Sequence, residues 1–212
     1  MQIAFLLFDD VNALDAVGAY EVLSNLPRAE VVWVAAERGP KRAVRGLNLI
    51  ATHVLGEVPR PDVVVVPGGF GERAAGQDPA VLSWLRQVHE TASWTVSVCT
   101  GALLLGRAGL LQGKRATTYW LALPELASYG AEAVSERWVI DGRICTSAGV
   151  SAGIDMSLAL AARIAGETVA QAVQLGIEYD PRPPFSAGSP AGAGPEIVSL
   201  VRARYAARRA GL

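Results

Sequence analysis

The chain has 212 residues, of which 51% are hydrophobic and 18% are charged, so it can bury a substantial core and cannot be disordered throughout. The 19 Lys and Arg residues nearly balance the 20 Asp and Glu residues, which gives a formal net charge of -1. This balance provides no broad positive field, and we expect neither nucleic acid nor a membrane as a partner.

Cysteine usage and the N-terminal residues indicate a cytoplasmic protein. Cys99 and Cys145 are too few for a disulfide framework or a cysteine-based zinc site. The first residues, MQIAFLLFDD, carry no positive charge ahead of their apolar run, which is too short for a signal peptide or a membrane span. We therefore expect a cytoplasmic location and free thiols.

Short apolar runs alternate with segments of helical spacing along most of the chain. In chain order, we expect a strand at 2–8, a helix at 15–26, a strand at 30–36, a weak hairpin at 38–53, a strand at 62–66, a helix at 79–91, a strand at 94–98, helices at 100–110 and 120–129, a hairpin at 137–146, and helices at 151–165 and 168–177. This alternation predicts an α/β fold with a mostly parallel sheet and helices on both faces.

We expect a single α/β domain over residues 1–180. Residues 181–195 (PRPPFSAGSPAGAGP) have no periodicity and predict an extended segment rich in Pro, Gly and Ala, followed by a helix at 196–209. We expect this tail, residues 181–212, to pack on the domain or on a dimer partner.

Ligands of such sheets bind beyond the carboxyl ends of the strands, which directs attention to three loops. In one loop Cys99 stands where an apolar strand turns into a helix, in the pattern Ser97-x-Cys99-x-Gly101. Small residues on both sides are typical of a nucleophile elbow, and amides of the following helix can lower the pKa of the thiol. The alternative is a buried structural cysteine, which is our interpretation of Cys145.

The other two loops offer a glycine turn and a carboxylate. Gly68 and Gly69 end a core strand, where their backbone amides can turn toward an anion. Asp15 opens the helix after the first strand. It either suits the helix dipole behind an Asn12 N-cap, or shares a proton with substrate or thiol, with its pKa raised by apolar neighbours. The local sequence leaves both readings open.

The two histidines lie away from these loops. His53 falls in the 38–53 hairpin, and His89 lies well down the helix at 79–91. A Cys-His-Asp triad therefore lacks a base, which argues against amide hydrolysis.

Three segments together resemble the ThiJ/PfpI superfamily: VPGGFG at 66–71, VCTGALLLGRAGLLQGKRATTYW at 98–120, and SAGVSAGIDMSLALAARIAG at 147–166. The tail EYDPRPPFSAGSP is similar to the branch that contains isocyanide hydratase. The resemblance covers nearly the whole chain. It implies a flavodoxin-like, doubly wound fold and a homodimer.

The resemblance carries the family's site onto this chain residue by residue. The implied catalytic residues are Cys99, Asp15 and Thr100, and the implied oxyanion-binding backbone amides are those of Gly68 and Gly69. Tyr119 and Trp120 are the implied pocket residues. Many members with peptidase-like or glyoxalase activity carry His in place of Thr100, and some relatives carry His in place of Tyr119. These differences concern the choice of substrate more than the fold.

These residues predict an isocyanide hydratase-like enzyme that acts on a small molecule without metal or cofactor. It would form an N-substituted formamide through a thioimidate on Cys99, with Asp15 moving the proton. Two alternatives stay open: glyoxalase or deglycase-type chemistry on α-oxoaldehydes, and a non-catalytic redox or stress protein with an oxidisable Cys99. The same branch supplies ligand-binding domains of AraC-type regulators, but the helix at 196–209 cannot supply a DNA-reading module of several helices. We therefore do not expect a regulator.

Overall fold

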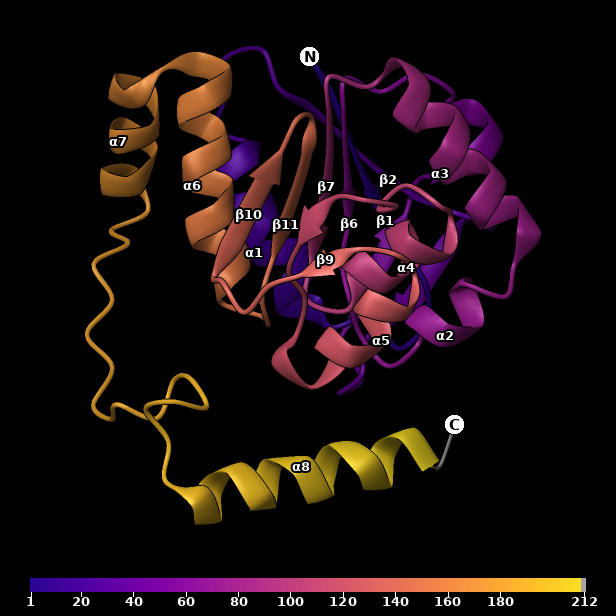
Figure 1. Ribbon diagram of the computed structural model, residues 1–212. Coiled ribbons are helices and arrows are strands. Elements are labelled where there is room, and N and C mark those ends of the chain that lie inside the picture. The colour runs from indigo at the N-terminus through magenta and orange to yellow at the C-terminus, as the bar shows by residue number, and fades with distance from the viewer. Residues whose placement is uncertain (211–212) are drawn as a thin grey trace. The chain divides into compact units, whose positions relative to one another are not determined.

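A computed structural model describes residues 1–210 of the chain. A seven-stranded sheet in the order β10-β11-β7-β6-β1-β2-β5 organises residues 1–177 (Figure 1). Its strands are β1 (Gln2–Leu6), β2 (Glu30–Ala35), β5 (His53–Val54), β6 (Val63–Val66), β7 (Trp94–Val98), β10 (Trp138–Asp141) and β11 (Ile144–Ser147). Neighbours pair in parallel except β10 and β11, which form the expected antiparallel hairpin.

Helices cover both faces of this sheet (Figure 1). One face carries α1 (Ala13–Leu23), α6 (Ala152–Ala165) and α7 (Glu167–Gly176). The other carries α2 (Glu72–Ala75), α3 (Pro79–Thr91), α4 (Gly101–Arg107) and α5 (Leu123–Ser128). The predicted flavodoxin-like, mostly parallel α/β fold is confirmed.

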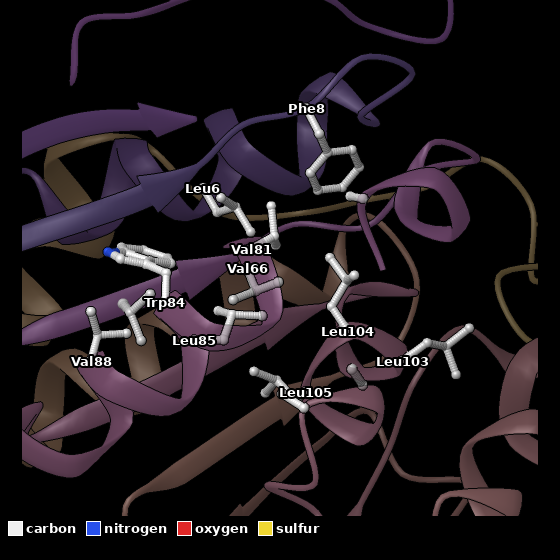
Figure 2. Close-up of a cluster of buried hydrophobic side chains, with 14 of the residues drawn as sticks. Leu6, Phe8, Val66, Val81, Trp84, Leu85, Val88, Leu103, Leu104 and Leu105 are labelled. Atoms are coloured by element: carbon white, nitrogen blue, oxygen red, sulfur yellow. The ribbon is translucent and has the colours of Figure 1, made fainter. Parts of the chain in front are cut away.

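The alternation of side chains along the strands divides the core in two. On β1, Ile3 and Phe5 pack toward α1 and α6, whereas Ala4 and Leu6 pack toward α3 and α4. Figure 2 shows part of the second layer, where leucines and valines of α3 and α4 meet Leu6 and the sheet. Because successive side chains of a strand point to opposite faces, the continuous apolar runs read from the sequence serve both layers.

Several small elements differ from the expectations. Within the 38–53 segment, β3 (Gly39–Arg42) and β4 (Asn48–Ala51) form a separate two-stranded sheet, and β5 alone joins the edge of the main sheet. A second small sheet, β8 (Arg115–Ala116) with β9 (Glu132–Ala133), and the one-turn helix α2 were not expected. Two 3₁₀ turns, Leu55–Glu57 and Trp120–Ala122, complete this unit. Elements of two to four residues are too short to show a period.

The chain divides into two compact units, Met1–Ile177 and Glu178–Leu212. The second unit contains α8 (Pro195–Ala210), a basic helix that buries none of its residues. Among the described residues, no helix has the length and apolar character needed to cross a membrane.

A buried ion pair joins α2 to the end of α4. The Arg107 guanidinium donates to the Glu72 carboxylate at 2.8 Å and to the Glu72 carbonyl at 3.0 Å. It also donates to Glu125 at 3.0 Å and to the Tyr129 hydroxyl at 2.8 Å. The Glu72 side chain is 1% exposed, so the Arg107 guanidinium compensates a carboxylate charge that is shielded from water.

We expect Arg107→Ala to lower the free energy of unfolding by about 3–5 kcal/mol, because it leaves the buried Glu72 carboxylate without its guanidinium partner. Urea unfolding followed by circular dichroism measures this loss. Arg38→Ala is the matched control, since Arg38 pairs with Glu57 at the surface and its loss should change stability little. Equal losses in the two variants would contradict the account.

Candidate active site

Cys99 occupies a strained turn between β7 and α4. Its φ is 57°, in the left-handed region that a non-glycine residue adopts only when its surroundings hold it there. Its N–H donates to the carbonyls of Ser147 and Ala148 at 3.1 and 3.2 Å, and its carbonyl accepts from the Thr118 hydroxyl at 2.7 Å. A Cβ at Gly101 would lie 2.0 Å from the Val66 carbonyl oxygen, which explains the glycine two residues after the cysteine. This is the geometry of a nucleophile elbow.

Asp15 lies in the first turn of α1 and is fully buried. Its carboxylate accepts from the Gly68 N–H at 3.1 Å and from the Asn12 side-chain amide at 2.9 Å. Asn12 is the N-cap residue, yet its side chain makes no capping bond to the helix backbone. The Cys99 thiol donates to the same carboxylate, so Asp15 is placed to exchange a proton with the sulfur.

Burial controls the proton affinity of both groups. Desolvation raises the pKa of Asp15 from 3.8 to about 7, against the hydrogen bonds from Cys99, Gly68 and Asn12. Desolvation, followed by the negative charge of Asp15, raises the pKa of the Cys99 thiol well above its ordinary value, although the Thr100 and Val150 amides lower it. The amides lower the thiol pKa in the expected direction, but they do not outweigh burial beside a carboxylate, so the pKa is raised and not lowered.

The glycine turn after β6 holds the catalytic candidates in place. The Gly68 N–H is engaged by Asp15, and the Gly69 N–H donates to the Thr100 hydroxyl at 3.0 Å. That hydroxyl in turn donates to the Gly69 carbonyl at 3.2 Å. The two glycine amides thus position Asp15 and Thr100, whereas the sequence suggested that they face a bound anion.

The amides directed at the sulfur belong to Thr100 and Val150. The side-chain patterns of the sequence do not single out Val150, although it lies in the family-like segment at 147–166. It follows β11, which pairs in parallel with β7, so the loop after β11 reaches the same edge of the sheet as Cys99. The rule that selected the other three loops would have found it.

The implied pocket residues form an aromatic pair. The rings of Tyr119 and Trp120 meet edge-to-face with centroids 5.9 Å apart, and both side chains are half-buried. The ring of Tyr119 lies against Gly149, where a Cβ would come within 2.7 Å of its Cδ2 atom. Over residues 1–210, no three His, Cys, Asp or Glu side chains gather in a group that could hold a metal ion.

Residues 1–163 match the family model described as the DJ-1/PfpI family. The chain belongs to this family. Its relatives include the isonitrile hydratase of Pseudomonas putida, which is 44% identical over 206 residues, covering 97% of this chain and 90% of the relative.

A crystal structure of a ThiJ/PfpI family protein from Pseudomonas syringae superposes with a TM-score of 0.92 and 36% identity, over 94% of this chain and 84% of the other. The HTH-type transcriptional regulator CdhR of Pseudomonas aeruginosa is 34% identical over 173 residues. That match covers 78% of this chain but only 51% of the regulator. The family thus contains both an enzyme and a regulator that are similar to this chain.

The raised pKa of Asp15 makes folding stability depend on pH. The unfolded chain releases the Asp15 proton near 3.8, whereas the folded protein keeps it to about 7. Between these values the folded state binds more protons, so the free energy of unfolding falls as pH rises, by about 4 kcal/mol from this group. Above this interval the penalty is constant.

Asp15→Asn removes this penalty. The altered hydrogen bonds change the stability of the variant by the same amount at every pH. Beyond this constant difference, we expect the free energy of unfolding of the variant to increase relative to that of the wild type when the pH is raised from about 4.5 to 8. Denaturant unfolding of both proteins at the two pH values measures the change. A difference in stability that is the same at both would show that Asp15 ionises normally in the fold.

Proposed function

We propose that the protein hydrates an isocyanide to an N-substituted formamide, with Cys99 as nucleophile and Asp15 as acid and base. The observation that carries the proposal is the Cys99 thiol hydrogen-bonded to a fully buried carboxylate whose pKa is about 7. The 44% identity to the isonitrile hydratase of Pseudomonas putida over nearly the whole chain supports the substrate class.

The first half of the reaction forms a thioimidate. In the reactive state Cys99 and Asp15 together hold one proton. The proton moves from sulfur to Asp15 as the sulfur attacks the terminal carbon of the isocyanide, and Asp15 then gives it to that carbon. A C–S bond and a C–H bond form, the carbon–nitrogen triple bond becomes a double bond, and Asp15 is left ionised.

The second half adds water. Asp15 takes a proton from water as the oxygen attacks the thioimidate carbon, and the proton passes to the nitrogen. The tetrahedral intermediate then collapses: the proton that remains on the hydroxyl oxygen passes to the ionised Asp15, the C–S bond breaks, and the formamide leaves. Asp15 and Cys99 again share one proton, so the cycle consumes one water for each isocyanide.

Backbone amides support the charge that the sulfur carries when the thioimidate forms and breaks. The Thr100 and Val150 amides stabilise the thiolate. The Thr100 hydroxyl acts through the glycine turn, because both of its hydrogen bonds go to Gly69. Thr100 is thus a positioning residue through its side chain and a catalytic residue through its amide.

Hydration of an aromatic isocyanide by the purified, reduced protein, followed by absorbance of the formamide, tests the proposal. We expect Cys99→Ala to abolish activity and Asp15→Asn to lower kcat at least about a hundredfold, because each removes a group that the first step requires. Cys145→Ala is the matched control, since Cys145 is fully buried in β11 away from these contacts. Full activity of Asp15→Asn would refute the assigned roles.

The same assay predicts a pH profile. Below about pH 7 Asp15 becomes protonated while the thiol keeps its proton, so the pair has no base left. We expect kcat/KM to rise with pH, with an apparent pKa near 7 that belongs to the coupled pair, and then to level off. Activity that is flat from roughly pH 5 to pH 8 would contradict the one-proton pair.

Two further expectations from the sequence stay predictions: a homodimer and a cytoplasmic location. Gel filtration at the mass of a single chain would contradict the dimer. Should the reduced protein hydrate no isocyanide, lactate formation from methylglyoxal and peroxide oxidation of Cys99 test the α-oxoaldehyde and redox alternatives.

A further inference from the structure

Val150 holds an unfavourable backbone conformation beside the reactive sulfur. Its φ is 46°, a left-handed value that is costly for a β-branched residue. Its amide is one of the two that reach the Cys99 sulfur. Neighbouring contacts must therefore hold the segment from Ala148 to Ser151 in place.

Hydrogen bonds hold this segment at its two ends. At its first residue, the Ala148 N–H donates to the Arg137 carbonyl at 2.9 Å, and the Ala148 carbonyl accepts from the Cys99 N–H. Toward its end, the Gly149 and Val150 carbonyls accept at 3.3 Å from the first amides of α6. None of these bonds involves the Val150 N–H, so they leave the direction of that amide to the packing around Gly149.

The side chain packed there is Tyr119. A Cβ at Gly149 would lie 2.7 Å from Cδ2 and 3.3 Å from Cε2 of Tyr119, so the ring fills the space that a side chain of residue 149 would take. The φ of Gly149 is not in the left-handed region, and the need for glycine comes from this close approach alone.

Tyr119 is itself fixed close to the cysteine. The preceding residue, Thr118, donates its hydroxyl to the Cys99 carbonyl, and the Tyr119 carbonyl accepts from Ala122 at 2.7 Å. The half-buried ring also packs against both core layers. One short stretch of chain thus connects the backbone of the cysteine to the segment that carries the Val150 amide.

We propose that Tyr119 is a positioning residue: its ring, packed on Gly149, holds the Val150 amide against the sulfur of Cys99. The proposal deepens the proposed function by adding a residue that supports the nucleophile. It concerns the sulfur itself and can be tested without any isocyanide.

Alkylation of Cys99 by iodoacetamide tests the proposal in the whole protein. Tyr119→Leu removes the ring contact, so the thiolate loses a charge-assisted hydrogen bond, and we expect alkylation at fixed pH to slow about tenfold. A role of Tyr119 limited to lining the pocket predicts the opposite, because leucine opens the site and alkylation becomes faster. Unchanged or faster alkylation would therefore overturn the proposal.

Two other variants separate positioning from loss of stability. Tyr119→Phe keeps the ring and should stay within about twofold of the wild-type rate, since the ring makes the contact with Gly149. Tyr129→Leu is the matched control, because a Cβ at Gly106 would likewise lie 2.7 Å from Cδ2 of Tyr129, and Gly106 lies near the end of α4, whereas Cys99 precedes its start. Slowing in either variant equal to that in Tyr119→Leu would refute the proposal.

A change at Gly149, the other partner of the contact, provides an independent test that remains available if Tyr119→Leu fails to fold. Gly149→Ala places a methyl group against the ring and should displace the Val150 amide, which slows alkylation and speeds hydrogen exchange at Val150. In the double variant that combines Tyr119→Leu with Gly149→Ala, the leucine leaves room for the methyl group. We expect alkylation of the double variant to slow by less than the product of the factors measured for the two single variants. Wild-type behaviour of Gly149→Ala, or strictly multiplicative effects, would count against the contact.

Distinct results separate this proposal from the proposed function. If the protein hydrates isocyanides but Tyr119→Leu is alkylated at the normal rate, the proposed function is supported and the positioning role of Tyr119 is refuted. If the protein lacks hydratase activity but Tyr119→Leu is alkylated more slowly as expected, the positioning role is supported and the proposed function is refuted.

Discussion

A hydrogen bond from a thiol to a carboxylate that is shut off from water governs this site. Water would stabilise the ionised carboxylate and return Asp15 to an ordinary pKa, and the pair would then no longer share its proton near neutrality. The fold must therefore bury Asp15 completely, and it buries Cys99 almost as deeply. The exposed fractions of the two residues are 0% and 6%.

The sheet order makes this pair possible. Cys99 follows β7 and Asp15 follows β1, and β6 lies between these two strands. The turn after β6 bridges the gap, because its first glycine binds the carboxylate and its second binds the residue after the cysteine. Strands whose side chains pack on both faces fix the register, so these loops meet without freedom to slide. The two packed layers thus hold the left-handed backbone at Cys99 and Val150.

Much of this arrangement could be predicted from the sequence because it follows from patterns with a period or a fixed order. Apolar runs alternating with helical spacing gave the α/β sheet, and the carboxyl-end rule brought Asp15, Gly68 and Cys99 to one edge. Two features escaped this reasoning. The direction of the thiol pKa depends on how deeply Cys99 lies beside Asp15, which is a property of packing. The amide of Val150 carries no signature in a side chain, since backbone groups are the same at every residue.

The close approaches of backbone around Cys99 affect how such a site can change over evolution. Added side-chain atoms at Gly68 or Gly101 would meet the main chain of Thr100 or Val66 within 2.5 Å, so single substitutions there disrupt the site outright. Leu14, next to Asp15 in sequence, is 44% exposed and can be exchanged at little cost. Exposed positions such as Leu14 can therefore change over evolution more readily than the glycines that hold the backbone around Cys99. A library built at Leu14 would mostly yield folded proteins, whereas one built at the two glycines would mostly yield proteins with a disrupted site.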